Sequence, residues 1–99
     1  MKRFTTPTHR FKVNEDLTNA EVVILTYAQG GRILFSKQKE DLTIESNLIS
    51  YTLSQKETGS FDINSLVSIE ITAKFPDGSR ITSDTMTVKV EQVLYTKEI

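Results

Sequence analysis

The sequence contains no cysteine, no tryptophan and a single histidine among its 99 residues. Without cysteine the chain can form neither a disulfide nor a thiolate metal site, and it has no cysteine nucleophile. A Ser-His-acid triad would have to use His9, which lies in a predicted strand on the same face as Phe11. We expect a half-buried or edge histidine there, and we predict no catalytic residue, no metal site and no cofactor.

The sequence also lacks long apolar runs and an excess of charge of either sign. No stretch approaches the ~18 consecutive apolar residues of a membrane-spanning helix. The basic start of the chain, residues 1–7, is not followed by an apolar segment, so we expect no secretory signal. Twelve Lys and Arg stand against thirteen Asp and Glu, whereas nucleic-acid-binding domains are usually basic. We therefore expect neither a membrane nor a nucleic acid as partner.

Motifs that carry chemistry are absent from the loops. The acidic pairs Glu15-Asp16 and Glu40-Asp41 are adjacent in sequence, so their side chains splay apart instead of flanking a cleft, as glycosidase carboxylates must. Asn14, Asp16 and Asp41 could meet as a surface calcium site, but they lack the spacing of an EF-hand loop. Gly30-Gly31 is explained by a hairpin turn, which leaves no glycine-rich phosphate loop. These features predict a protein that is not an enzyme.

What the chain does contain is alternation with a period of two, which is typical of half-buried strands. It is clearest in residues 66–75 and recurs in residues 85–91. We expect further strands at residues 8–13, 20–28, 33–37, 42–44 and 48–53. The segment 20–28 is apolar on both faces, so we expect it to be a central strand that is covered on both sides or passes under a loop.

A turn signal, Pro76-Asp77-Gly78, separates the two alternating segments. A three-residue loop at this place would pair Ala73 with Ile81 on the core face. A two-residue loop made by Asp77 and Gly78 would place Ile81 on the outer face instead. The sequence leaves both registers open.

With the three-residue loop, the alternation slips by one residue further along the chain. One extra residue around positions 83–85 would bring Met86 opposite Ile69 and Val88 opposite Val67, all on the core face. We therefore predict a β-bulge at residues 83–85.

Only one segment has a helical signal. Ser54 followed by Glu57 forms a capping-box pattern, which we expect to open one or two helical turns that Gly59 ends. Phe61 and Ile63 are expected to fill the core from this connection.

About seven short strands with regularly spaced turns predict a single all-β domain over residues 1–99, an immunoglobulin-like antiparallel β-sandwich with one short helical turn. Residues 1–7 form an N-terminal arm and residues 94–99 a C-terminal tail. Both carry apolar side chains outside any predicted strand, which can fold back onto the domain or dock on a neighbouring protein. The candidate interaction residues are Phe4, Pro7, Leu94, Tyr95 and Ile99.

Several short motifs run through the chain: Arg3 with Thr5-Thr6-Pro7-Thr8, Asp16–Ala20, Tyr27–Gly30, Leu53–Thr58, Phe61, and Ser83–Met86 followed by Val88 and Val90. Together they resemble a family of small proteins encoded among the structural genes of tailed phages and prophages of Gram-positive bacteria. Phe4 stands where the resemblance gives a glycine.

The resemblance implies a non-enzymatic phage structural or virion-assembly accessory protein with an immunoglobulin-like fold. Its partners would be other phage structural proteins, or further copies of itself. It would lie in the virion, or in the host bacterial cytoplasm during assembly. The alternative is a free-standing binding module for cell-wall carbohydrate or another surface ligand, for which Tyr27, Tyr51 and Tyr95 would have to supply the aromatic contacts.

Overall fold

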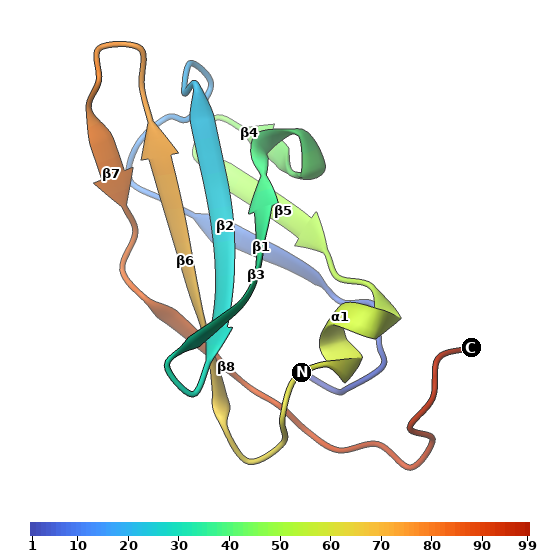
Figure 1. The fold of residues 1–99 in the computed structure, drawn as a ribbon. Helices are drawn as coiled ribbons and strands as arrows, with labels where there is room; N and C mark the ends of the chain where they lie inside the picture. The colour runs from blue at the N-terminus through green and yellow to red at the C-terminus, as the bar shows by residue number, and fades with distance from the viewer.

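Two antiparallel sheets packed face to face make up the protein in a computed structural model that describes residues 1–99 (Figure 1). The elements in chain order are β1 (Thr8–Lys12), β2 (Val22–Gln29), β3 (Arg32–Gln38), the 3-10 turn η1 (Lys39–Asp41), β4 (Thr43–Glu45), β5 (Leu48–Thr52), α1 (Gln55–Gly59), β6 (Leu66–Lys74), β7 (Arg80–Thr82) and β8 (Met86–Lys89).

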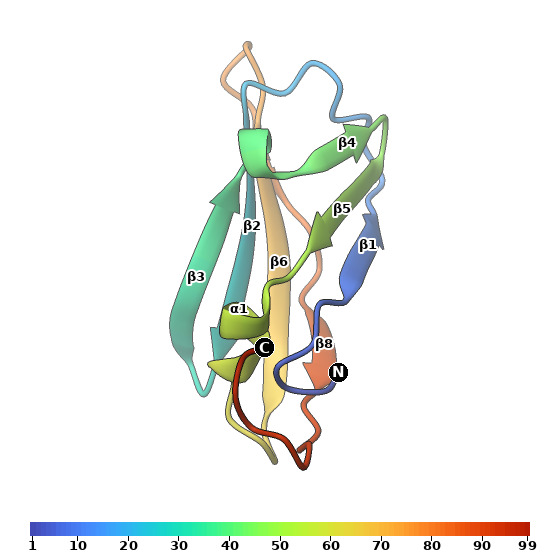
Figure 2. The ribbon, with the colours of Figure 1, turned by 90° about the vertical axis from the view of Figure 1, so that its right-hand side faces the viewer.

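One sheet has three strands in the order β1-β5-β4, and the other has the order β3-β2-β6, with β7 and β8 pairing in turn along the free side of β6. The two layers are visible edge-on in Figure 2. The predicted all-β antiparallel sandwich is confirmed. Its strands number eight instead of about seven, because residues 80–82, between the two alternating segments, form a short strand of their own, β7.

The core lies between the sheets and is built from alternate residues of each strand. In β2, Val23, Leu25 and Tyr27 are fully buried, as expected for the central strand between β3 and β6. The sequence predicted that this strand is covered on both sides or passes under a loop, and full cover on both sides is wrong. The three-stranded sheet covers only one face, so Val22 and Ile24 on the other face remain half-buried.

The loop between β6 and β7 has three residues. The Phe75 N–H donates to the Ser79 carbonyl at 2.9 Å, and Ala73 pairs with Ile81. Gly78 has φ +89°, the left-handed conformation that glycine adopts without steric cost. The three-residue register is thus confirmed and the two-residue alternative is wrong.

The predicted irregularity at residues 83–85 is also confirmed. Ser83 binds Ile71 twice, since its N–H donates to the Ile71 carbonyl at 2.8 Å and its Oγ accepts from the Ile71 N–H at 2.9 Å. The next pair along the ladder is Met86 with Ile69, one residue out of step with the β7 register. A single serine therefore holds the extra residue in place while both flanking strands keep their apolar side chains inward.

The helical turn α1 closes one end of the sandwich (Figure 2). Its capping box is complete, because Ser54 Oγ accepts from the Glu57 N–H at 3.1 Å and the Glu57 carboxylate accepts from the Ser54 N–H at 2.9 Å. The helix ends at Gly59, as predicted. Phe61 then enters the core with no exposed surface, and Ile63 packs against the core partly buried.

Candidate interaction site

The N-terminal arm (residues 1–7) folds back onto its own domain. The Met1 amino group donates to the Lys89 carbonyl at 2.7 Å, and the Glu91 N–H donates to the Met1 carbonyl at 2.8 Å. The Arg3 N–H donates to the Glu91 carbonyl at 3.1 Å, and Lys2 forms a parallel bridge with Glu91. The arm therefore extends the five-stranded sheet beyond the end of β8.

The two apolar candidates of the arm lie on this domain. Phe4 is half-buried, its ring covers Gly59, and its φ is +58°, a conformation that favours glycine over phenylalanine. The Arg3 guanidinium donates to the Gly59 carbonyl at 2.7 Å and lies 5.1 Å from the Phe4 ring centroid. Pro7 is half-buried as well, and its carbonyl accepts from the Leu53 N–H at 3.0 Å.

The C-terminal candidates are placed differently. Leu94, Tyr95 and Ile99 are 106%, 61% and 93% exposed. Beyond Gln92, the hydrogen bonds of this segment are the pair between the Ile99 backbone and the Gln55 side chain, at 2.8 and 2.9 Å. The tail thus curls past α1 (Figures 1 and 2), and these three apolar side chains lie in solvent.

Strand β1 leaves one side open for another strand. It pairs with β5 alone. A hydrogen bond lies just beyond each end of this pairing: the Val13 N–H donates to the Asn47 carbonyl, and the Leu53 N–H donates to the Pro7 carbonyl. In an antiparallel ladder only alternate residues bond to the partner strand. The N–H and C=O groups of Thr8, Arg10 and Lys12 therefore point along the open edge.

A hollow of about 410 Å³ lies where β1 ends, between that end and the irregular segment joining β7 and β8. Apolar side chains form much of it, and lysine and acidic groups supply charge around it. It is lined by Lys12, Val13, Asn14, Glu15, Leu17, Ile71, Ile81, Thr82, Ser83, Asp84 and Met86. The hollow thus brings together the end of β1, the loop that follows it, and the segment 81–86.

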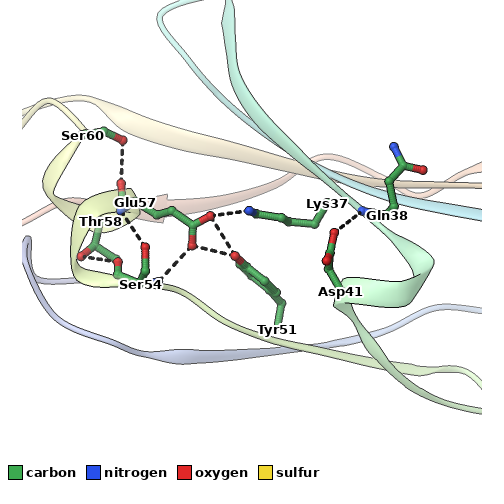
Figure 3. Close-up of polar contacts among 8 residues, drawn as sticks. All are labelled: Lys37, Gln38, Asp41, Tyr51, Ser54, Glu57, Thr58 and Ser60. Carbon is green, nitrogen blue, oxygen red and sulfur yellow. Dashed lines mark hydrogen bonds and ion pairs between the residues drawn. The ribbon is translucent and has the colours of Figure 1, made fainter.

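On another side of the sandwich, a polar cluster joins β3, β5 and α1 (Figure 3). Lys37 Nζ lies 2.8 Å from Glu57 Oε2, and Tyr51 Oη lies 2.6 and 2.8 Å from the two carboxylate oxygens. The Lys37 and Glu57 side chains are 27% and 15% exposed. Sequence reasoning identified Glu57 only as a helix cap, because its two other partners come from distant strands.

The contacts within the cluster favour the charged forms of Lys37 and Glu57. Burial acts to raise the pKa of Glu57, but hydrogen bonds from Lys37, Tyr51 and the Ser54 backbone outweigh it and lower that pKa. The bond to Glu57 raises the pKa of Lys37, and burial together with Glu57 raises the pKa of Tyr51 to about 12. Because Lys37 comes from the five-stranded sheet and Tyr51 from the three-stranded sheet, their shared contact with Glu57 acts as a clamp between the sheets.

His9 is half-buried, as predicted, and its Nδ1 lies 2.9 Å from Tyr27 Oη. Burial lowers the pKa of His9 and so favours the neutral form of the ring. Of the tyrosines that a carbohydrate site would need, Tyr27 has no exposed surface and Tyr51 is half-buried against Glu57. Tyr95 is exposed alone in the tail.

The acidic residues of the loops stay apart, and no three histidine or carboxylate side chains gather in a way that could hold a metal ion. Asp16 instead binds Thr18 next to it, with its Oδ1 2.9 Å from the Thr18 nitrogen. The two helical segments, of three and five residues, are much too short to cross a membrane.

No family model, no curated protein and no solved structure matches this chain.

Proposed function

We propose that this protein is a non-enzymatic structural or assembly accessory protein of a tailed phage or prophage, and that it acts through protein–protein contacts. The observation that carries the proposal is the C-terminal tail, where Leu94, Tyr95 and Ile99 stand in solvent. Burying a large apolar side chain stabilises a complex by about 1.5–3 kcal/mol. A segment with three such side chains gains most by docking on another protein.

The open edge of β1 supports the same conclusion. Edge strands accept strands of other chains, and proteins that must avoid this usually shorten, charge or cover their edges. Arg10 and Lys12 give this edge some positive charge, but no element of the domain covers it. The protein thus carries both an apolar segment for docking and a sheet edge that can receive a strand.

The resemblance supplies the biological setting of the proposal. The partners are other phage structural proteins or further copies of this chain, and the protein resides in the virion or, during assembly, in the host bacterial cytoplasm. In the N-terminal arm, Phe4 and Pro7 are half-buried on their own domain. The arm therefore contributes less apolar surface to the partner contact than the C-terminal tail does.

Purified particles provide the test. We expect the full-length chain to co-purify with particles from the source at a fixed ratio to the other structural proteins, or with assembly intermediates. A chain that ends at Gln92 should fold but be lost from these fractions, whereas the variant Thr96→Ala, which alters the tail without removing an apolar anchor, should be retained. Particles and intermediates that both lack the full-length chain would contradict the proposal.

A further inference from the structure

We propose that residues 93–99 of a second copy of this chain add as a strand along β1 and cover the hollow beside it. The inference rests on the proposed function and names its partner, its donor segment and its acceptor edge. A seven-residue strand spans about 24 Å, which matches β1 and the hollow beyond its end. The arrangement is head-to-tail, since the tail of each copy enters the edge of the next.

The three-stranded sheet has no strand beyond β1 that would cover the inward faces of β7 and β8 in the opposite sheet. The inward faces of β7 and β8 carry Ile81, Met86 and Val88, which are only half-buried although they pack against the core. The opposite sheet ends at β1, and the hollow opens between β1 and the segment 81–86. A fourth strand next to β1 would lie over these side chains and satisfy the open N–H and C=O groups of the edge.

The tail has the alternation that such a strand needs. Val93, Tyr95 and Ile99 fall on one face together with Lys97, while Leu94, Thr96 and Glu98 fall on the other. With the first set inward, tyrosine and the two aliphatic side chains face the inward side of β1 and the apolar part of the hollow beyond it.

The charges of the tail and the acceptor are complementary on both faces. On the inward face, the long Lys97 side chain reaches toward Glu15 and Asp84, which line the hollow. On the outward face, Glu98 joins the face of β1 that carries Arg10 and Lys12. A charge-complementary strand is favoured over an unrelated apolar one because like charges across such a contact are unfavourable.

The tail of the same molecule does not fill the edge. Its start is fixed where Glu91 pairs with the N-terminal arm, and its end is tied to Gln55 in α1. It therefore lies at the α1 end of the sandwich (Figure 2), whereas the hollow lies at the far end of β1. The two hydrogen bonds to Gln55 are exposed, so their release costs little.

Sedimentation across a concentration series tests the donor with a matched pair of variants. Tyr95→Asp places a carboxylate on the inward face of the tail, and Thr96→Asp places it one residue further, on the outward face. Both positions are exposed, so neither variant threatens the fold. We expect wild type to associate, Tyr95→Asp to weaken association about tenfold or more, and Thr96→Asp to stay within about twofold of wild type.

Amide hydrogen exchange tests the acceptor. In concentrated wild type, the amides of Thr8, Arg10 and Lys12 should exchange at least about tenfold more slowly than in Tyr95→Asp, because docking occupies the edge. The amides of His9 and Phe11 bond to β5 and should be protected equally in both. Protection of the edge that does not depend on concentration would show an intramolecular strand and overturn the proposal.

Other outcomes are equally decisive. A chain that remains monomeric up to about 1 mM, or a matched pair that behaves identically, would overturn docking of a second copy. If such a chain were still recovered with particles, the proposed function would stand and the partner would be another protein. If the tail bound β1 of a second copy but neither particles nor assembly intermediates contained the chain, the self-contact would stand and the proposed function would fail.

Discussion

Glu57→Gln isolates the charge of the clamp that joins β3, β5 and α1. Glutamine keeps the capping box, since its amide oxygen still accepts from the Ser54 N–H. What is lost is the ion pair with Lys37 at 2.8 Å and the charge-assisted bond from Tyr51 at 2.6 Å. Hydrogen bonds to charged groups are worth about 1.5–3 kcal/mol when buried, and exposed ion pairs about 0–1. For a carboxylate that is 15% exposed, we expect a loss of about 1–2 kcal/mol.

The loss should depend on pH in a definite direction. The pKa of Glu57 in the folded protein lies below its ordinary value of 4.5. Its stabilisation is therefore complete above the unfolded pKa and is lost as the pH falls through the folded pKa. Wild type and Glu57→Gln should differ most at pH 7 and converge at pH values below the lowered pKa, where wild type carries a neutral carboxyl at this position.

Urea unfolding followed by far-ultraviolet circular dichroism measures the effect. With a slope of about 1 kcal/mol per molar urea for a domain of this size, the midpoint should fall by about 1–2 M at pH 7. Glu40→Gln is the matched control, because Glu40 is exposed in η1, and it should change stability by less than about 0.5 kcal/mol. An unchanged midpoint at pH 7, or an equal loss at pH 7 and in acid, would refute the clamp.

Three further substitutions test the backbone features of the fold. Ser83→Ala removes the Oγ that accepts from the Ile71 N–H at 2.9 Å, so urea unfolding should show a loss of about 1–2 kcal/mol; no loss would mean that water replaces the hydroxyl. Gly31 has φ +76° with open space around it, so Gly31→Ala should cost about 1 kcal/mol in thermal unfolding and Gly31→Asn less. A Cβ at Gly59 would lie 2.7 Å from Cδ1 of Phe4, so Gly59→Ala should release the N-terminal arm to proteolysis. An arm that is cut no faster than in wild type would contradict this packing.

Features governed by short-range rules were predictable from the sequence. The inward residues of β6, the capping box of α1 and the turn at residues 76–78 each depend on neighbours within a few positions. The β-bulge followed as well, because only one extra residue could keep both Ile81 and Met86 on the core side. Its actual stabiliser, the Ser83 hydroxyl, could not be read from the pattern.

The ends of the chain show the opposite case. Phe4 and Tyr95 are both aromatic residues outside the predicted strands, and nothing in the sequence distinguishes them. In the structure Phe4 is half-buried over Gly59, whereas Tyr95 is 61% exposed. Their difference arises because the arm finds a partner backbone at β8 and the tail beyond Gln92 does not.

The sequence by itself thus determined the strands, their inward faces, the tight turns and the sandwich class, since alternation and turn chemistry act locally. Only the tertiary structure decided that one face of β2 stays half-covered, that Lys37 meets Glu57, and that β1 ends its sheet with an open edge beside a hollow. These features depend on which strands share a sheet and how far each sheet extends. That choice balances contacts between residues far apart in the chain, and no local pattern records it.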